Sequence, residues 1–336
     1  MKVAVLAPVA WRSPPRHYGP WEQVASNVAE GLVAAGVDVT LFATADSVTA
    51  GTLAAVVARG YEEDRTQDAK VLECLHISHL MERAAEFDLI HNHFDFLPLT
   101  YSRLIPTPMV TTIHGFSSAR ILPVYQHYAA TSAYVSISDA DRHPSLPYAA
   151  TVYNGLRMAD FSFVAQPADY LLFLGRIHPD KGPFEAIQIA RQSGRRLLLA
   201  GIVQDQAYFD ECVQPFLSDT IEFLGPVGPM RRNLLLGNAA ALLHPIRFDE
   251  PFGLSVAEAQ LCGTPVIAFN RGAMPELIQA GQTGFLVSNV GEAVAALQQL
   301  GELSRATCRA WATAEFSQEK MVADYLAVYR QLLRRG

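Results

Sequence analysis

The strongest constraint on the fold is an order of strand, loop, helix and strand that occurs in both halves of the chain. In the first half, apolar runs at 3–9 and 37–42 flank a segment of helical spacing at 22–35. The second half repeats this order at 170–174, 184–193 and 197–200. A helix between two buried strands is typical of a parallel sheet with a right-handed crossover. The sequence therefore predicts an α/β protein with two Rossmann-like domains.

Polar residues follow three more predicted strands of the first half, at 88–91, 109–113 and 134–137. Ligands of open parallel sheets bind beyond the carboxyl ends of the strands. The side chains expected at this edge are those of His91, His93, His114, Ser138 and Asp139.

The length of 336 residues also favours two domains over a single core. A linker-like stretch at 154–168 separates the two patterns, and an amphipathic helix is expected at 316–333. We expect an N-terminal domain at 1–160, a C-terminal domain at 161–312 and a terminal helical segment at 313–336.

The composition argues against several functional classes. Half of the residues are hydrophobic and 18% are charged, which is typical of a soluble globular protein. The net charge of −7 argues against nucleic acid as a partner. Four cysteines without close spacing indicate reduced thiols in a cytoplasmic protein, rather than disulfides or a zinc site. The first apolar run is too short for a signal peptide, and no stretch approaches the ~18 apolar residues of a membrane span.

The stretch at 244–269 predicts a loop, a short helix, a tight turn and a buried strand at 266–269. Pro251 suits the first position of the helix, and Gly263 suits its end, where a positive φ is needed. The free N–H groups of the helix start would form an anion site. The residues expected to supply these N–H groups are Phe252, Gly253 and Leu254.

Two carboxylates accompany this predicted helix. Glu250 lies before it, and Glu258 lies about two turns inside it. At ~1.5 Å per residue, this spacing separates the carboxylates by roughly 10–12 Å along the helix. One carboxylate could hold a sugar hydroxyl while the other holds a ribose of the same ligand.

The order Glu250, Pro-Phe-Gly-Leu, Glu258 and Gly-Thr-Pro-Val resembles the Glu-x7-Glu signature of the retaining glycosyltransferases of family 4. Their GT-B fold implies two Rossmann-like domains that face each other across a cleft, with the terminal helix crossing back to the N-terminal domain. The resemblance implies that Glu250 holds hydroxyls of the donor sugar and that Glu258 holds the ribose.

Two cations, Arg176 and Lys181, lie in a Gly-Arg-Ile-His-Pro-Asp-Lys-Gly loop directly after a predicted strand. Such a loop can neutralise a diphosphate, and each charge-assisted hydrogen bond contributes roughly 1.5–3 kcal/mol. Two solvated loop charges would be the ordinary interpretation. The resemblance to the family's Gly-Arg…Lys-Gly loop favours the donor site instead.

His114 ends the run Val-Thr-Thr-Ile-His-Gly. By itself it is consistent with a strand-end histidine that bonds to the backbone. The resemblance places it at the family's active-site histidine, as a contact to the transferred sugar rather than a nucleophile.

The run Tyr18-Gly-Pro-Trp-Glu resembles the family's Gly-Gly loop, which approaches the diphosphate and the acceptor. Pro20 replaces the second glycine and removes an N–H donor. The resemblance implies that Gly19 approaches the donor and that Tyr18 contacts the acceptor.

Two segments invite a metal interpretation. His91 and His93 lie on one face of a strand end, but no third ligand is evident, so we favour acceptor contacts by His93 and Asp95. Asp139 and Asp141 look like the metal-binding Asp-x-Asp of another glycosyltransferase class, yet they are expected to cap a short helix. No metal or other cofactor is expected.

The resemblance further implies that the backbone at Val227, in the Gly-Pro-Val turn, contacts the nucleotide base. An ordinary turn is equally consistent with these residues. Because backbone contacts leave little trace in the side chains, the sequence does not identify the base of the nucleotide.

The function implied by the resemblance is retaining, metal-independent transfer of a hexose from a UDP- or GDP-sugar to a hydroxyl of a glycan, a lipid-linked acceptor or a small molecule. The implied catalytic residues are His114, Arg176, Lys181 and Glu250. The alternatives are a GT-B epimerase, a phosphorylase, for which no motif nominates a pyridoxal-phosphate lysine, and a non-catalytic sugar-nucleotide binder. Peripheral membrane contact and the oligomeric state stay open.

Overall fold

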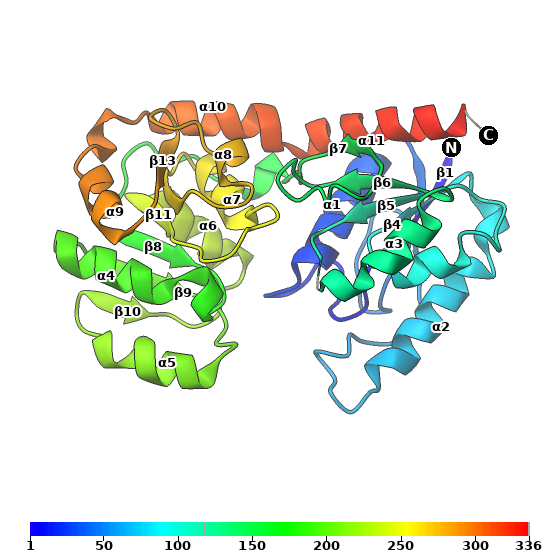
Figure 1. Cartoon of the computed structure of the whole chain (residues 1–336), viewed down its shortest axis with the longest axis horizontal. Coiled ribbons are helices and arrows are strands. Elements are labelled where there is room, and N and C mark those ends of the chain that lie inside the picture. Colours follow the sequence, from blue (N-terminus) through cyan, green and yellow to red (C-terminus); the bar gives the residue numbers. More distant parts are fainter. Residues whose placement is uncertain (117, 335–336) are drawn as a thin grey trace. The chain divides into compact units, whose positions relative to one another are not determined.

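The computed structural model describes residues 1–116 and 118–334 (Figure 1). Its contacts divide the chain into two compact units. One unit comprises Met1–Leu156 with the C-terminal segment that starts at Gln318, and the other comprises Arg157–Ser317. The expected boundaries at 160/161 and 312/313 lie a few residues away from these divisions. Each unit contains one parallel sheet covered by helices, so the predicted fold class is confirmed.

The sheet of the first unit has seven parallel strands in the order β3-β2-β1-β4-β5-β6-β7. The strands are β1 (Lys2–Leu6), β2 (Asp38–Phe42), β3 (Thr52–Ala54), β4 (Leu89–Asn92), β5 (Met109–Ile113), β6 (Ser132–Ser136) and β7 (Tyr148–Thr151). The register pairs Val5 with Leu41 on one side and with His91 on the other. The first strand ends at Leu6 rather than Val9, although Val9 is buried.

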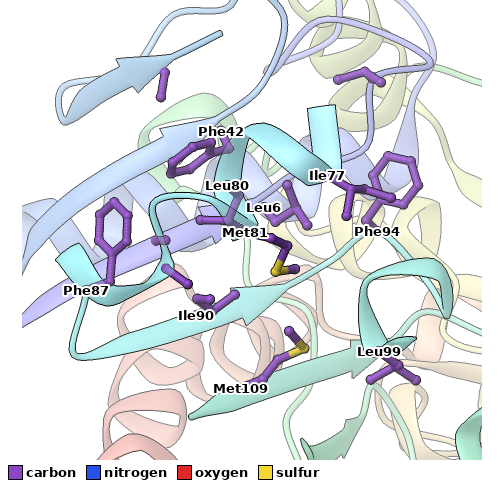
Figure 2. Packing of buried hydrophobic residues seen from close by; sticks show 14 of the residues in the cluster. Leu6, Phe42, Ile77, Leu80, Met81, Phe87, Ile90, Phe94, Leu99 and Met109 are labelled. Carbon is purple, nitrogen blue, oxygen red and sulfur yellow. The ribbon is translucent and has the colours of Figure 1, made fainter. Parts of the chain in front are cut away.

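The α-helices of this unit are α1 (Pro20–Ala34), α2 (Ala69–Met81), α3 (Leu122–Tyr128) and α11 (Gln318–Leu333). Short 3₁₀ turns lie at Ala84–Glu86, Leu97–Tyr101 and Ala119–Ile121. Figure 2 shows the core under α2, where Leu80 and Met81 lie near Phe42, Ile90 and Met109.

The terminal helix α11 packs against α1 through a glycine. A Cβ on Gly31 of α1 would lie 2.5 Å from Val322 Cγ2 and 2.9 Å from Gln318 Cγ. The Gln318 side-chain amide donates to the Asn27 carbonyl at 2.7 Å. The close approach of the two helices therefore depends on the missing side chain at position 31.

The sheet of the second unit has six parallel strands in the order β10-β9-β8-β11-β12-β13. They are β8 (Leu171–Leu174), β9 (Leu197–Ala200), β10 (Ile221–Phe223), β11 (Ala241–His244), β12 (Val266–Phe269) and β13 (Gly284–Val287). The α-helices are α4 (Pro183–Ser193), α5 (Gln206–Cys212), α6 (Pro229–Asn238), α7 (Leu254–Leu261), α8 (Met274–Leu277), α9 (Val290–Leu297) and α10 (Arg305–Phe316). Its 3₁₀ turns lie at Met158–Asp160, Pro179–Lys181, Gln214–Phe216 and Leu300–Glu302.

Each sheet reverses its strand order once. In the first unit the reversal lies between β1 and β4, and in the second it lies between β8 and β11. The loops that follow the two strands of such a reversal diverge, which leaves the crevice where open α/β sheets bind ligands. Most of the expected site residues lie in these loops or in helix α7, whereas His114 follows β5 and Val227 follows β10.

Candidate active site

The loops after β8 and β11 bring together a cation and a carboxylate. Lys181 ends the 3₁₀ turn after β8, and its Nζ contacts Oε2 of Glu250 in the loop after β11. The Lys181 ammonium also lies 4.8 Å from the ring centroid of Phe248. The two charged side chains are only 15% and 12% exposed. Thus Lys181 and Glu250, both predicted from the sequence, meet at the strand-order reversal.

Backbone contacts hold these loops against each other. Gly182 has a φ of 72°, and a Cβ at this position would lie 2.0 Å from the Pro245 carbonyl oxygen. The Arg247 N–H donates to the Asp180 carbonyl at 2.7 Å. The close approach therefore requires glycine at position 182, and the Lys181–Glu250 pair is positioned by the backbone.

A second segment fixes the Glu250 backbone. The Ala273 N–H donates to the Glu250 carbonyl at 2.9 Å. A Cβ on Gly272 would lie 2.4 Å from both N and O of Glu250. These contacts explain why residues 250–252 are not helical, although Pro251 suits a helix start.

The expectation that Pro251 begins the helix is wrong. Helix α7 begins at Leu254, and Gly253, with a φ of 101°, is its N-cap. The Val256 N–H bonds to the Gly253 carbonyl at 3.0 Å, so the N–H groups of the first helical positions are those of Leu254 and Ser255. Phe252 lies before the helix with a buried side chain and supplies no first-turn N–H.

Glu258 is the fifth residue of α7, so it lies just over one turn inside the helix rather than about two. It is 4% exposed, and burial raises the pKa of its carboxyl, while Arg232 of α6 opposes this rise. Arg232 Nη1 lies 3.4 Å from Glu258 Oε1. No sequence motif nominates Arg232, because its partner lies on another helix.

His244 was also missed as a site residue. It ends β11, and its Nε2 lies 3.8 Å from Glu250 Oε2. Burial lowers the pKa of His244 to about 4, against the opposing effect of Glu250, so the ring is neutral at pH 7. The sequence signal that could have identified His244 was its position at the end of a strand.

Arg176 and Val227 follow two strands of the same sheet, β8 and β10, which are separated by β9. Arg176 follows β8, and its Nη1 donates to Oε1 of Gln204 rather than to Glu250. The Gly201 N–H donates to the Gly225 carbonyl at 3.0 Å, which places the turn before Val227 beside the end of β9. Val227 is buried.

In the first unit, His114 follows β5 and stacks on Trp21 of α1. Their ring centroids lie 5.6 Å apart with an interplanar angle of 24°. His93 Nδ1 lies 2.9 Å from His114 Nε2. His93 has no exposed surface, so a direct contact with an acceptor does not fit its position.

Behind this pair, His91 links the sheet to α11. Its Nδ1 lies 2.6 Å from the Tyr329 hydroxyl, and its Nε2 lies 2.7 Å from Thr112 Oγ1. Thr112 Oγ1 lies 2.8 Å from the Tyr325 hydroxyl. Both tyrosines are fully buried. Sequence reasoning missed them because these bonds join segments far apart in the chain.

The first turn of α1 contains a buried carboxylate, that of Glu22. Gly19 has a φ of 145° and caps α1, which begins at Pro20. The Trp11 N–H donates to Glu22 Oε1 at 3.1 Å. Burial raises the pKa of Glu22 to about 7. Tyr18 packs edge-on against Trp11, with ring centroids 6.3 Å apart.

Asp95 adopts a left-handed conformation with a φ of 78° in the loop after β4. Its carboxylate accepts a hydrogen bond from the Tyr125 hydroxyl. Burial raises the pKa of Asp95 to about 6, while the bond from Tyr125 acts in the opposite direction. The backbone at Asp95 thus has a conformation that few residues other than glycine adopt, and its carbonyl accepts a hydrogen bond from the Asn92 side-chain amide at 2.9 Å.

The expectation that Asp139 and Asp141 cap a short helix is wrong. They lie in a turn between β6 and β7, where Asp139 accepts a hydrogen bond from the Thr151 hydroxyl. This hydrogen bond ties the turn to Thr151 at the end of β7, and in the described chain no helix follows for either aspartate to cap.

Among residues 1–116 and 118–334, no group of three or more His, Cys, Asp or Glu side chains is arranged to hold a metal ion. Within the same residues, no helix is both long and apolar enough for a transmembrane span.

Two family models match the chain. "Glycosyltransferase Family 4" matches residues 21–147, and "Glycosyl transferases group 1" matches residues 160–314. The glycogen synthase of Mycobacterium tuberculosis is 26% identical over 335 residues, which cover 82% of this chain and 80% of that protein. The D-inositol 3-phosphate glycosyltransferase of Mycobacterium bovis is 32% identical over 199 residues, covering 53% of this chain and 41% of that protein.

Solved structures share the fold over the whole chain. The crystal structure of AviGT4, a glycosyltransferase involved in avilamycin A biosynthesis, has a TM-score of 0.76 and 26% identity, covering 100% of this chain and 99% of that one. The structure of Anabaena Alr3699/HepE in complex with UDP and glucose has a TM-score of 0.76 and 18% identity, covering 99% and 100%. The predicted GT-B type of fold is confirmed by these similarities.

Proposed function

The chain belongs to the glycosyltransferases of family 4, and from this premise we propose that it transfers a hexose from a UDP- or GDP-sugar to a hydroxyl group with retention of the anomeric configuration. The observation that carries the proposal is the Lys181–Glu250 pair at the strand-order reversal of the second unit. A cation for the leaving diphosphate and a carboxylate for sugar hydroxyls stand there side by side.

The chemistry of the proposed reaction requires charge stabilisation. The transition state resembles an oxocarbenium ion, and negative charge develops on the leaving diphosphate. Lys181 and Arg176 stabilise this charge, and the first-turn N–H groups of α7 add to their effect. Glu250 accepts hydrogen bonds from hydroxyls of the sugar. No side chain is assigned as the nucleophile, so the leaving phosphate assists attack of the acceptor on the same face.

The nucleotide is held further along the same unit. Glu258 accepts hydrogen bonds from the ribose hydroxyls, and its ion pair with Arg232 opposes the rise in its pKa that burial causes. Gly253 and Leu254 approach the phosphates, and the backbone at Val227 contacts the base. The UDP and glucose bound by HepE, which has the same fold, support a sugar nucleotide as the ligand class.

The first unit receives the acceptor in this proposal. Tyr18 and Asp95 contact it, Gly19 approaches the donor phosphates, and His114 contacts the transferred sugar. The cationic loop takes the part that a metal ion has in other transferases, so no metal is needed. A cytoplasmic location agrees with the four free cysteines.

The test is product analysis with a panel of UDP- and GDP-hexoses. Release of the nucleoside diphosphate is measured chromatographically, and the anomeric configuration of the product is read by NMR. We expect release from at least one α-linked donor, an α-linked product, and no release by Glu250→Gln. A β-linked product would contradict retention. Nucleotide binding without release from any donor would indicate a non-catalytic sugar-nucleotide binder.

A further inference from the structure

We infer that His93 is a positioning residue that fixes His114 in the tautomer with its proton on Nδ1, so that His114 donates a hydrogen bond to an oxygen of its ligand. The tautomer follows from the structure, and only the identity of the ligand as a sugar rests on the proposed function. This assignment replaces the expected contact between His93 and an acceptor.

One hydrogen bond joins the two imidazoles. His93 Nδ1 and His114 Nε2 lie 2.9 Å apart, which is a hydrogen-bond distance. Burial lowers the pKa of His114 to about 3 and holds that of His93 well below its usual value. Both rings are therefore neutral near pH 7, and each carries its single proton on one nitrogen. One ring must donate and the other must accept.

The other nitrogen of the His93 ring, Nε2, decides which imidazole donates this hydrogen bond. Its Nε2 is buried and has no hydrogen-bond partner in the described part of the chain. If His114 donated, His93 would carry its proton on Nε2 and bury an N–H without an acceptor. Buried N–H groups without a partner are rarer than unused lone pairs, since they lose a strong donor interaction. The proton therefore lies on His93 Nδ1, and His114 Nε2 accepts it.

His114 is then left with its own proton on Nδ1. For the residues that the structure describes, no hydrogen bond to this atom is present, and His114 as a residue retains 8% exposure. Stacking on Trp21 fixes the plane of the ring. The partner that such a group selects is an oxygen lone pair, as in a sugar hydroxyl or ring oxygen, and not a cation or an N–H group.

The structure also prevents the His93 ring from exchanging its nitrogens freely. The His91 ring lies 4.1 Å from the His93 ring, centroid to centroid. His91 is itself bonded at both nitrogens, to Tyr329 and Thr112. The His114 ring lies 5.2 Å from the His93 ring, so two neighbouring imidazoles pack against His93.

The direct test is NMR of the full chain labelled with ¹⁵N in the histidine rings. Long-range ¹H–¹⁵N correlations report which ring nitrogen is protonated, and the His114→Phe and His93→Asn variants assign the two signals. We expect a proton on Nδ1 of both residues at pH 7.5. A proton on Nε2 of His114, or a charged His114 ring, would overturn the inference. The spectrum needs no turnover, so failure of the proposed function leaves this test intact.

A pair of variants adds a functional readout. His93→Asn keeps an N–H donor near the position of Nδ1, whereas His93→Asp offers an acceptor and should move the His114 proton to Nε2. We expect kcat of His93→Asp to be about tenfold below that of His93→Asn, which corresponds to one lost transition-state hydrogen bond. Equal kcat values with a shifted His114 proton would contradict the role of Nδ1–H.

Discussion

The ammonium group of Lys181 contacts the carboxylate of Glu250, although 69 residues separate them in the chain. The contact is made by two loops that Gly182 and Pro245 bring together. Both charges are mostly buried and are held by the backbone before any ligand arrives. A leaving group would therefore meet a cation whose position is already fixed, which is the condition for electrostatic stabilisation of a transition state.

Removing this cation should affect the chemical step more than binding. We expect Lys181→Met to lower kcat by about 100-fold and to change the donor KM much less, because the leaving group gains charge in the transition state. Steady-state kinetics with the preferred donor checks this. Lys70→Met, at an exposed lysine on α2, is the matched control. A higher KM with unchanged kcat would count against the role of Lys181.

The hydrogen bond between Tyr329 and His91 should stabilise the first unit. Tyr329→Phe leaves His91 Nδ1 buried without its partner, and we expect the free energy of unfolding to fall by about 1–3 kcal/mol. Urea denaturation measures it. In a His91→Phe background the same change should cost much less, because the bonded nitrogen is gone. Equal costs in both backgrounds would show that the bond contributes nothing.

The buried Glu22 should make stability depend on pH. Burial raises its pKa from 4.5 to about 7, so the folded protein binds this proton more tightly than the unfolded chain does. The contribution is therefore complete below pH 4.5 and is lost as the pH rises towards 7. We expect the stability difference between wild type and Glu22→Gln to change by about 3 kcal/mol over this range.

Denaturation curves at several pH values test the Glu22 prediction. Glu319→Gln, at an exposed position on α11, is the control and should show no such change. A pH-independent difference between wild type and Glu22→Gln would mean that Glu22 titrates normally.

Metal removal should leave turnover intact. If Lys181 and Arg176 stabilise the leaving diphosphate, EDTA should not lower the initial rate once the protein has been dialysed against a chelator. Rates with and without added Mg²⁺ provide the measurement. An absolute Mg²⁺ requirement would contradict the prediction and would direct attention back to Asp139 and Asp141.

The sequence predicted the strands well where apolar runs end at turn residues. Three predicted strands, at 109–113, 197–200 and 266–269, agree with β5, β9 and β12 at both ends. The first strand was extended to Val9 because burial continues after pairing with β2 and β4 has ended at Leu6. Hydrophobicity reports burial, but strand ends depend on the neighbours.

The start of α7 shows a different limit. Pro251 has the local preference for a helix start, yet Gly272 and Ala273 hold Glu250 in a loop. These contacts join segments more than 20 residues apart. Tertiary contacts therefore override a preference that is worth little by itself.

Only part of the site could be predicted, because tertiary contacts also decide which side chains come together there. Motif residues such as Lys181 and Glu250 could be found because a short pattern contains them. Arg232, Tyr325 and Tyr329 could not, because each acquires its role from a partner on another element, and the signal for His244 was only its position at a strand end. The burial of His93 likewise depends on neighbouring strands, which place the rings of His91 and His114 against it.

Nucleotide binding at Glu258 tests the central claim most directly. Thermal unfolding is measured with UDP, GDP, ADP and TDP on the wild type, on Glu258→Gln and on Glu211→Gln, an exposed control on α5. A nucleotide at ~100 times its Kd adds about 2.7 kcal/mol of stability. We predict that at least one nucleotide raises Tm of the wild type and the control but not of Glu258→Gln. No shift with any nucleotide, or the same shift in Glu258→Gln, would contradict the proposed donor site.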